Sequence, residues 1–317
     1  MDLRTWQQKI IDEFPSITQK YRKFILKAPT GAGKTVLASE IVERFYPDQK
    51  IIVLCHRLVL LEQLEEALGR KHAVRKLTGA DKGPAFDGYD ILLSTNLRAK
   101  EVLADAISKA DLIIVDEAHR VSPNGAAYKR IIDAFHAHGK PEAQFMGLTA
   151  SPERITNDQA DQLNLAFDTI IDCANIEDLI DEGVLVKPVY RPHFVHDLDL
   201  DDIDVSSGDF PVSKLSPAII KSSMIDYAVW SYSEEREKVA GKPISAWFCA
   251  DISVAEATLE KIQALGIEAV IVTAGTPIKE RMAVLARHEK GEVEAVVSVG
   301  VLIEGWDNPN CNIIVHL

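Results

Sequence analysis

A loop that could hold phosphate groups stands near the start of the chain, in the sequence Ala28-Pro-Thr-Gly-Ala-Gly-Lys-Thr35. It follows a strand-like apolar run and opens a segment with helical spacing, which is the context that a phosphate-binding loop requires. Gly31 and Gly33 allow a tight bend, so that backbone N–H groups and the positive end of the helix can face phosphate oxygens. Lys34 can neutralise the β- and γ-phosphates, and the Thr35 hydroxyl can bind Mg²⁺. The segment predicts a nucleoside triphosphate site in a variant form, with alanine at the first position of the pattern.

An acidic segment that could complete this site is Val115-Asp-Glu-Ala-His-Arg120. Asp116 falls at the end of an apolar run, and ligands of open α/β sheets collect at the carboxyl ends of strands. There Asp116 can hold Mg²⁺, directly or through water, and Glu117 can polarise the water that attacks the γ-phosphate. His119 could sense the site from the next turn. We therefore predict that Lys34, Asp116, Glu117 and His119 are catalytic, with Thr35 and Asp116 on the metal.

Strand-like and helical patterns alternate along the 317 residues, which predicts parallel sheets covered by helices. The length suits two domains of about 150 residues each. The expected strands are Phe24–Lys27, Ile51–Cys55, Ile91–Thr95, Leu112–Val115, Phe145–Leu148, Ile244–Cys249, Ala269–Thr273, Ala295–Val299 and Ile313–Leu317. The expected helices are Thr35–Phe45, Leu58–Leu68, one from the cap Asp251 to about Gly266, and one from Thr276 to before Gly291.

We expect two domains, at residues 1–185 and 186–317. The second begins with a linker or insert at about 186–242, which holds the acidic run Asp197–Asp204 and a helical pattern at about Ser216–Lys238. A charge run of this kind usually faces water, so a solvated linker or edge strand is favoured over a metal site.

Composition excludes several classes of protein. No apolar run is long enough to span a bilayer, and the N-terminus has no secretory signal pattern, so the expected location is cytoplasmic and no membrane partner is expected. The four cysteines stand far apart in the sequence, and each lies in or beside an apolar run. We therefore expect them to be buried, reduced thiols. The formal net charge of −13 argues against a protein that simply coats nucleic acid, so a nucleic acid would need a local basic groove.

Taken in order, these segments resemble the motifs of superfamily 2 helicases, closest to the DEAH-type ATPases of restriction enzymes and XPB-like DNA translocases. The resemblance covers nearly the whole chain and implies two tandem RecA-like domains of the P-loop class. Leu3-Arg-Thr-Trp-Gln7 is similar to the family's adenine-reading segment, and the Gln7 amide can pair with a donor and an acceptor of adenine. The resemblance implies that ATP is bound by Arg4, Gln7, Thr30, Gly31, Ala32, Gly33, Lys34, Thr35, Glu304, Gly305 and Asp307.

Other segments resemble the family's contacts with nucleic acid. They are Val53-Leu-Cys-His-Arg57 followed by Gln63, Ser94-Thr-Asn96 more weakly, and Thr273-Ala-Gly-Thr-Pro277. An ordinary strand end explains Ser94–Asn96 equally well. The resemblance implies nucleic-acid contacts at His56, Arg57, Thr95, Thr273 and Gly275.

Further segments resemble the parts that link hydrolysis to movement. Leu148-Thr-Ala-Ser-Pro-Glu-Arg154 is similar to the segment that couples hydrolysis to domain movement, through Thr149, Ala150 and Ser151. Leu179–Pro188 resembles the exit from the first domain, Trp247-Phe-Cys249 the fourth motif, and Ser298–Pro309 a motif that lines the cleft beside the nucleotide.

The resemblance implies an ATP-dependent nucleic-acid helicase or translocase that uses Mg²⁺, and it favours DNA over RNA as the nucleic acid without deciding between them. The family's last motif carries arginines for the γ-phosphate, and no Q-x-x-G-R-x-x-R pattern occurs in the chain. We therefore expect an incomplete second domain, in a truncated chain or natural fragment that hydrolyses ATP slowly.

Two functions of other classes remain as alternatives. The first is a module that binds nucleic acid under the control of ATP without turnover. The second is a metabolic P-loop kinase or transferase, which would need a small-substrate pocket and would have no Glu304-Gly-Trp-Asp307 segment.

Overall fold

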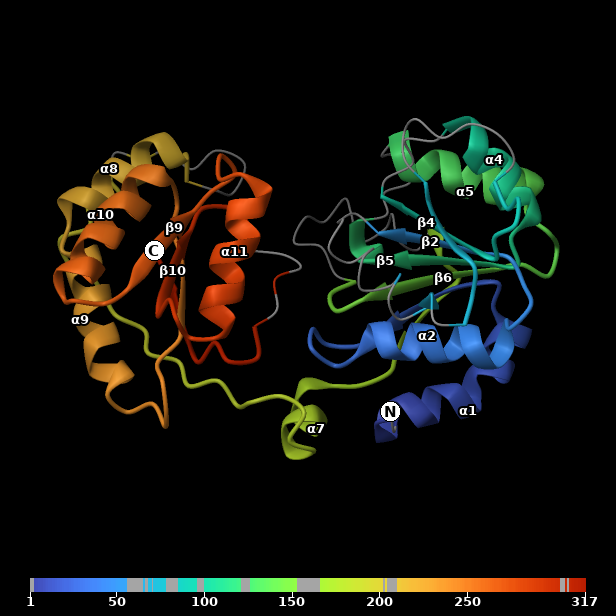
Figure 1. Ribbon diagram of the computed structural model, residues 1–317, viewed down its shortest axis with the longest axis horizontal. Helices are drawn as coiled ribbons and strands as arrows, with labels where there is room; N and C mark the ends of the chain where they lie inside the picture. The colour runs from blue at the N-terminus through green and yellow to red at the C-terminus, as the bar shows by residue number, and fades with distance from the viewer. Residues whose placement is uncertain are drawn as a thin grey trace. The chain divides into compact units, whose positions relative to one another are not determined.

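The computed structural model describes residues 3–55, 65, 68–69, 71–77, 85–95, 100–120, 126–152, 166–201, 203, 210–302, 306 and 308–317. The chain separates into two compact units, Met1–Pro188 and Val189–Leu317, each with its own sheet and core (Figure 1). The division falls close to residue 186, where the pattern of the sequence changes. No helix among these residues is long and apolar enough to cross a membrane.

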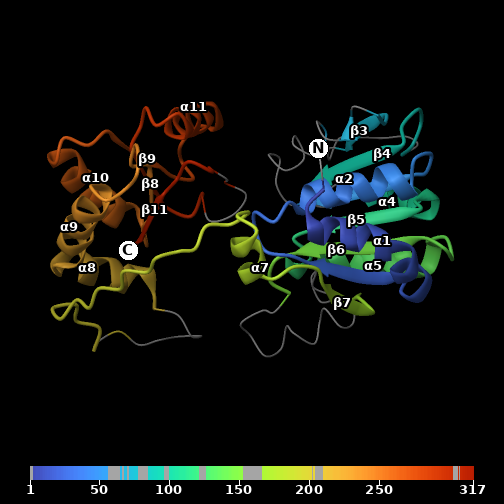
Figure 2. The ribbon, with the colours of Figure 1, turned by 90° about the horizontal axis from the view of Figure 1, so that it is seen from below.

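The first unit is built on a seven-stranded sheet in the order β3-β4-β2-β5-β6-β1-β7, with every pair parallel (Figure 2). Its strands are β1 Lys23–Lys27, β2 Ile51–Cys55, β3 Val74–Leu77, β4 Ile91–Thr95, β5 Leu112–Asp116, β6 Gln144–Thr149 and β7 Thr169–Asp172. The strand segments predicted in this half of the sequence are confirmed. The sequence missed β3 and β7, the two edge strands, because both are short and partly exposed and β3 carries charged side chains.

Helices cover both faces of this sheet, α4 and α5 on one side and α1 and α2 on the other (Figure 1). Helices α1 and α2 pack on one face through residues such as Phe14 and Ile41, which share a core with Phe24 and Leu26 of β1. Helices α4 and α5 pack on the other face, where the intervening Ile25 of β1 lies. Alternate residues of the central strands therefore enter different cores, as expected for a parallel sheet covered on both sides. The helices are α1 Thr5–Lys20, α2 Lys34–Phe45, α4 Lys100–Lys109, α5 Ala126–His138 and α7 Ile176–Asp181, with a 3₁₀ turn at Ala118–Arg120.

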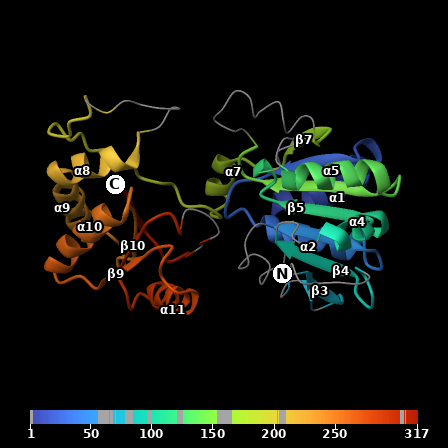
Figure 3. The ribbon, with the colours of Figure 1, turned by 90° about the horizontal axis from the view of Figure 1, so that it is seen from above.

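The second unit has a four-stranded parallel sheet in the order β11-β8-β10-β9. Its strands are β8 Ser245–Phe248, β9 Ala269–Val272, β10 Ala295–Ser298 and β11 Ile313–His316, and its helices are α8 Val212–Lys221, α9 Met224–Arg236, α10 Ile252–Ala264 and α11 Ile278–Glu289. Strands β9 and β10 lie between α10 and α11 (Figure 3). Helices α8, α9 and α10 share one core with the sheet, and α11 packs against the opposite face.

The predicted start of α10 is confirmed in detail. The side-chain oxygen Oδ1 of Asp251 accepts a hydrogen bond from the backbone N–H of Val254 at 3.0 Å. Gly266, which follows the last turn, has a φ of +75°, a conformation that glycine adopts without strain.

The expected linker or insert at 186–242 contains two helices of the second core. Ile219 of α8 and Ile225, Val229 and Tyr232 of α9 are buried beside the sheet. The single helical pattern predicted at Ser216–Lys238 is wrong, because α8 ends at Lys221 and α9 begins at Met224. Asp197 accepts hydrogen bonds from the N–H and hydroxyl groups of Ser223 at 2.9 and 2.8 Å, which fixes the break between the helices. The predicted helix at Leu58–Leu68 lies almost wholly outside the described residues.

Candidate nucleotide site

The sheet of the first unit brings the two predicted motifs together. Strand β6 lies between β1 and β5, so the carboxyl ends of these three strands are neighbours. Lys27 of β1 lies opposite Thr149 of β6, and Asp116 of β5 lies opposite Leu148. The phosphate loop starts at Ala28, whose N–H donates to the carbonyl of Thr149 at 3.0 Å. The loop, the acidic segment and the coupling segment therefore meet at one edge of the sheet, where ligands of such sheets bind.

The loop adopts a conformation that only glycine takes easily at two positions. The φ angles of Gly31 and Gly33 are +76° and +95°, and Gly33 caps helix α2. Ala32 is buried, and its N–H donates to the carbonyl of Pro29 at 3.2 Å. The ammonium group of Lys34 donates to the carbonyls of Ala28 and Pro29 at 3.0 and 3.1 Å. The Lys34 side chain thus folds back over the same loop in which it is predicted to bind the β- and γ-phosphates.

The start of α1 holds the phosphate loop from outside. The guanidinium Nη1 of Arg4 donates to the carbonyls of Gly31 and Ala32 at 3.2 and 2.5 Å. The side-chain Nε2 of Gln7 donates to the carbonyl of Gly33 at 2.9 Å. Because the C=O and the following N–H of a trans peptide point in opposite directions, the N–H groups of Gly33 and Lys34 are directed away from α1. Arg4 and Gln7 therefore orient the N–H groups that would face a phosphate.

Gln7 is bound to the protein rather than free in a pocket. Its Oε1 accepts from the N–H of Arg4 at 2.9 Å, and the side chain is 2% exposed. A primary amide has two N–H groups and two acceptor lone pairs, so each end of Gln7 keeps one further hydrogen-bonding position. Contact of Gln7 with adenine stays a prediction.

The charges at the carboxyl end of β5 and the start of α2 are suited to a bound cation. Burial, followed by the charge of Glu117, raises the pKa of Asp116 to about 6. Burial lowers the pKa of Lys34, while Glu117 and Asp116 act against that change. A buried carboxylate that is costly to ionise gains stabilisation from a nearby cation. The Asp116 side chain therefore suits a metal ion as neighbour.

The donor set at this edge matches Mg²⁺ held mainly by a nucleotide. Asp116 and Thr35 offer oxygen atoms, and Mg²⁺ prefers oxygen ligands, often one or two carboxylates with phosphates and waters. Among the described residues, no group of three or more His, Cys, Asp or Glu side chains could hold a metal by itself. The residues present fit an ion that arrives with a triphosphate.

Glu117 begins the turn that follows β5 in an uncommon backbone conformation. Its φ of +51° is the only positive value at a non-glycine residue in the part of the chain that the structure describes. A left-handed conformation at such a residue costs about 1 kcal/mol or more. The reversal leads directly into the 3₁₀ turn and brings His119 back toward the sheet, with its Nδ1 3.1 Å from Oε2 of Glu117.

The coupling segment contacts the acidic segment through His119. Nδ1 of His119 lies 2.9 Å from the hydroxyl oxygen of Thr149, which is fully buried. The same hydroxyl accepts a hydrogen bond from the N–H of Ser151 at 3.3 Å. Ala150 stands between them, directly after β6. The predicted coupling residues thus adjoin the predicted catalytic residues, and Thr149 is the point of contact.

Gly147 is a positioning residue that the sequence analysis missed. A Cβ atom at this position of β6 would lie 2.7 Å from Cβ of Ala118 and 3.1 Å from Cγ1 of Ile25. Only glycine therefore lets the turn after Glu117 pack so closely on the sheet. The available signal was a glycine inside an apolar strand, which often marks close approach of another backbone.

The second unit contains the predicted phosphate-contacting loop, Thr273–Pro277. The Thr273 hydroxyl accepts from the N–H of Gly275 at 3.2 Å, and the Thr276 hydroxyl accepts from the N–H of Thr273 at 3.0 Å. Each hydroxyl keeps its own hydrogen, which can be donated to a phosphate oxygen. Arg281 of α11, another residue that sequence reasoning missed, donates to the carbonyls of Thr273 and Thr276 at 3.2 Å each.

Several predicted site residues lie outside what the structure describes. They are His56, Arg57, Glu304, Gly305 and Asp307. Thr95 ends β4, and only its backbone is described. Their proposed contacts stay predictions.

Comparisons with known proteins agree with this arrangement. The model of the family "type III restriction enzyme, res subunit" matches residues 1–154. A 51.5 kDa protein of Lactococcus phage (isolate 7-9) is 25% identical over 92% of this chain and 58% of its own length. The Saccharomyces cerevisiae protein IRC3, whose name assigns it to the ATP-dependent helicases, is 25% identical over 98% of this chain and 46% of its own length. The chain thus spans about half the length of these relatives.

The fold is also shared with solved helicase structures. The helicase domain of Pyrococcus furiosus Hef superposes with a TM-score of 0.62 at 19% identity, over 99% of this chain and 89% of that one. The two parallel sheets are therefore RecA-like domains, as predicted. Residues 1–154 match that family model, and the chain is similar over nearly its whole length to an ATP-dependent helicase. With the ordered motifs and the site at the ends of β1, β5 and β6, these similarities support a superfamily 2 helicase-type ATPase.

Proposed function

We propose that this chain is the ATP-dependent motor of a nucleic-acid helicase or translocase of the DEAH type, and that DNA is its preferred track. The observation that carries the proposal is the meeting of Lys34, Asp116 and the His119–Thr149 contact at one edge of the first sheet. A triphosphate-binding loop alone fits many enzymes. A contact between the acidic segment and the next strand end is what a motor needs to report the state of its nucleotide.

In this proposal, Arg4 and Gln7 preset the phosphate loop, and Lys34 leaves its own carbonyl partners to bind the β- and γ-phosphates. Thr35 and Asp116 would hold Mg²⁺, which supplies charge neutralisation on the phosphate oxygens. Glu117 would orient and deprotonate the attacking water. Binding energy for ATP that differs between two conformations of the protein would then drive movement along the strand.

Residues of both units would take part in this cycle. The match of residues 1–154 to a restriction-enzyme subunit family supports DNA as the track. Glu304, Gly305 and Asp307 would contribute to nucleotide binding from the second unit, and His56, Arg57, Thr95, Thr273 and Gly275 would contact the strand. We also propose a cytoplasmic location, which the wide spacing of the four cysteines along the sequence supports.

The decisive experiment is steady-state ATP hydrolysis by the chain alone and with single-stranded DNA, duplex DNA and RNA. Lys34→Ala serves as the blank, and Lys9→Ala on the exposed side of α1 controls for the loss of a positive charge. We expect turnover that depends on Lys34 and that DNA stimulates more than RNA does. Stimulation by RNA alone would overturn the preference for DNA.

The same experiment separates the proposal from its rival. ATP and nucleic acid that bind together without turnover would identify a regulated binding module. Turnover that no nucleic acid stimulates would contradict the motor and favour a different P-loop enzyme. Strand displacement and translocation assays on the stimulating nucleic acid then distinguish a helicase from a translocase.

A further inference from the structure

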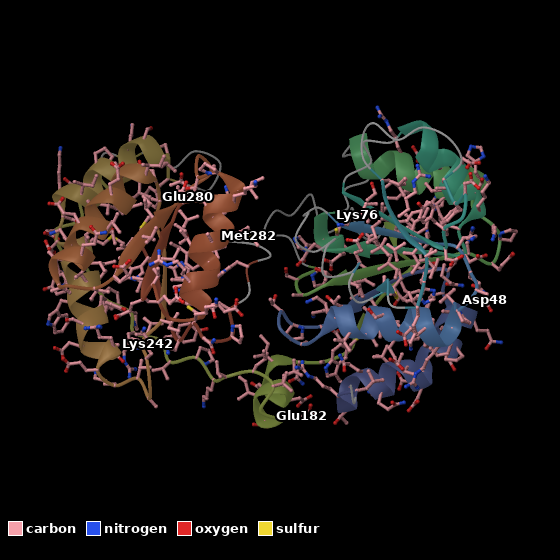
Figure 4. The ribbon with its side chains drawn as sticks, viewed as in Figure 1. Asp48, Lys76, Glu182, Lys242, Glu280 and Met282 are labelled. Atoms are coloured by element: carbon pink, nitrogen blue, oxygen red, sulfur yellow. The ribbon has the colours of Figure 1, made fainter. Side chains whose placement is uncertain are left out.

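One face of helix α11 carries two polar anchors that hold different loops of the second unit. Arg281, Val284 and His288 follow one another at intervals of three and four residues, which places them on the same side of the helix. That side faces the sheet, because Val284 and His288 are buried. Glu280 and Met282 lie on the exposed side (Figure 4).

The first anchor is Arg281, near the start of α11. Its Nη2 donates to the carbonyls of Thr273 and Thr276 at 3.2 Å each. The loop between these residues is already closed by its own hydrogen bonds, including that from the N–H of Thr276 to the carbonyl of Thr273 at 3.1 Å. The loop is thus held together by its own hydrogen bonds, and Arg281 attaches the whole loop to helix α11.

The second anchor is His288, at the end of α11. Its Nε2 lies 3.0 Å from the carbonyl oxygen of Ser245, which can only accept, so Nε2 carries the proton. Nδ1 is then an acceptor, and it receives a hydrogen bond from Nδ2 of Asn308 at 3.1 Å. Oδ1 of Asn308 accepts from the N–H of Asn310 at 2.9 Å, which agrees with this orientation of the amide. His288 is fully buried, and burial lowers its pKa, so the ring is held neutral between both partners.

Further contacts bind the same segment to the end of α11. The ring centroids of Trp306 and His288 lie 5.8 Å apart. Nδ2 of Asn310 donates to the carbonyl of Glu289 at 3.0 Å. Leu302 and Trp306 share an apolar cluster with Val284 in the middle of the helix. The chain on both sides of Asp307 is therefore fastened to α11.

We infer that α11 joins the Thr273–Pro277 loop mechanically to the segment around Asn308, with Arg281 and His288 as positioning residues. This inference rests on the proposed function, in which one segment contacts the strand and the other adjoins the nucleotide. Two helical turns, about 10 Å, separate the anchors. A packed helix of this length moves as one body, so a shift of the loop displaces the Asn308 segment as well.

Hydrogen exchange in the absence of any ligand tests the mechanical link. The variants are His288→Leu and Arg281→Met, and Lys279→Met on the exposed side of α11 controls for the lost charge. The reporting amides are Gly275 and Thr276 in one loop, and Asn310 and Cys311 in the other. Each of these N–H groups has a hydrogen bond within its own segment.

We expect either variant to speed exchange by about threefold or more in both segments, because coupling between two sites is reciprocal. If each variant loosens only the segment that it touches, α11 does not join them and the inference is wrong. Asn308→Ala also removes the hydrogen bond between Asn308 and His288, and it replaces His288→Leu if the latter does not fold. Because it removes the acceptor of the Asn310 N–H as well, only Gly275, Thr276 and Cys311 report in that variant.

Nucleic-acid stimulation of ATP hydrolysis tests the functional consequence. We expect His288→Leu to reduce the stimulation by about tenfold, a typical size for coupling between sites. His288→Gln should restore most of it, since its amide can donate to Ser245 and accept from Asn308. Equal loss of basal and stimulated rates, or no difference between the two variants, would overturn the positioning role. If the parent chain shows no stimulation at all, the proposed function fails, and the exchange result still decides whether α11 is the link.

Discussion

The imidazole Nδ1 of His119 lies 2.9 Å from the hydroxyl oxygen of Thr149, across 30 residues of sequence. This contact joins the acidic segment after β5 to the end of β6. The hydroxyl is fully buried and also accepts from the N–H of Ser151, so its position is determined on two sides. A change at the acidic segment therefore reaches the segment Ala150–Ser151 directly.

Thr149→Val tests this contact, since it keeps the shape of the side chain and removes the hydroxyl. We expect kcat for nucleic-acid-stimulated ATP hydrolysis to fall by about 10²-fold, as for the loss of a group that positions a general base. The KM for ATP should change less, because the lost hydroxyl binds His119 and Ser151, whereas the backbone carbonyl that holds Ala28 of the phosphate loop is kept. Thr149→Ser should recover most of the rate. A valine variant with unchanged kcat would show that the contact has no part in catalysis.

Arg4→Met tests the role of α1 in holding the phosphate loop. Without hydrogen bonds to the carbonyls of Gly31 and Ala32, the loop loses its fixed orientation, and we expect ATP affinity to fall by about tenfold. Titration calorimetry with a nonhydrolysable ATP analogue measures the loss. Lys9→Met removes a positive charge from the exposed side of the same helix and should leave the affinity unchanged. An equal loss in both variants would point to charge alone.

Gly33→Ala should abolish ATP binding and destabilise the first unit. The added Cβ would lie 2.9 Å from Nε2 of Gln7 and 3.4 Å from Nη1 of Arg4, at a φ of +95°. Gly183→Ala is the matched control, because Gly183 has a φ of +70° and open space around the position of its Cβ. The control should lose only about 1 kcal/mol of stability and keep ATP binding. Thermal unfolding and nucleotide binding of both variants make the comparison.

Asp116→Asn should stabilise the chain in the absence of nucleotide, and only above acidic pH. Because the pKa of Asp116 is raised to about 6 on folding, the folded chain binds a proton there more tightly than the unfolded chain does. The free energy of unfolding therefore falls as pH rises from about 4 to 6, and stays lower above that range. We expect the variant to exceed the parent by about 1–3 kcal/mol at pH 8 and to match it near pH 4.

Urea unfolding of parent and variant at both pH values checks this prediction. Asp48 lies in the turn after α2, and its side chain is exposed (Figure 4). The variant Asp48→Asn therefore controls for the loss of a surface charge. A difference between Asp116→Asn and the parent that does not depend on pH would refute the assigned cause.

Glu294→Gln should destabilise the second unit by about 2–3 kcal/mol. Both oxygens of Glu294 accept from Arg236, each at 2.8 Å, and Oε1 also accepts from the hydroxyl of Tyr232 at 2.7 Å. The carboxylate is largely buried, so the substitution leaves the Arg236 charge without its partner. Urea unfolding followed by tryptophan fluorescence reports on this unit, which contains Trp230, Trp247 and Trp306. Glu292→Gln, an exposed change nearby, should alter stability by less than about 0.5 kcal/mol.

The local pattern of the sequence was sufficient for the parts of the site that depend on neighbouring residues. The phosphate loop needs glycines, a lysine and a helix start within eight positions, and the acidic segment needs a strand end. The central strands were visible because each is a short apolar run between turn residues. The cap Asp251 was visible because it precedes helical spacing.

Only the tertiary structure decided which distant residues support these segments. Arg4 and Gln7 were assigned to the nucleotide, yet they also orient the loop from 26 to 28 residues away. Gly147, Arg281 and the pair His288–Asn308 carry no local signature, because their roles consist of contacts with other elements. The break between α8 and α9 depends on Asp197, which stands 26 residues before Ser223. Hydrophobic periodicity encodes each element and its buried face, whereas side-chain hydrogen bonds between elements arise only when the sheets bring their ends together.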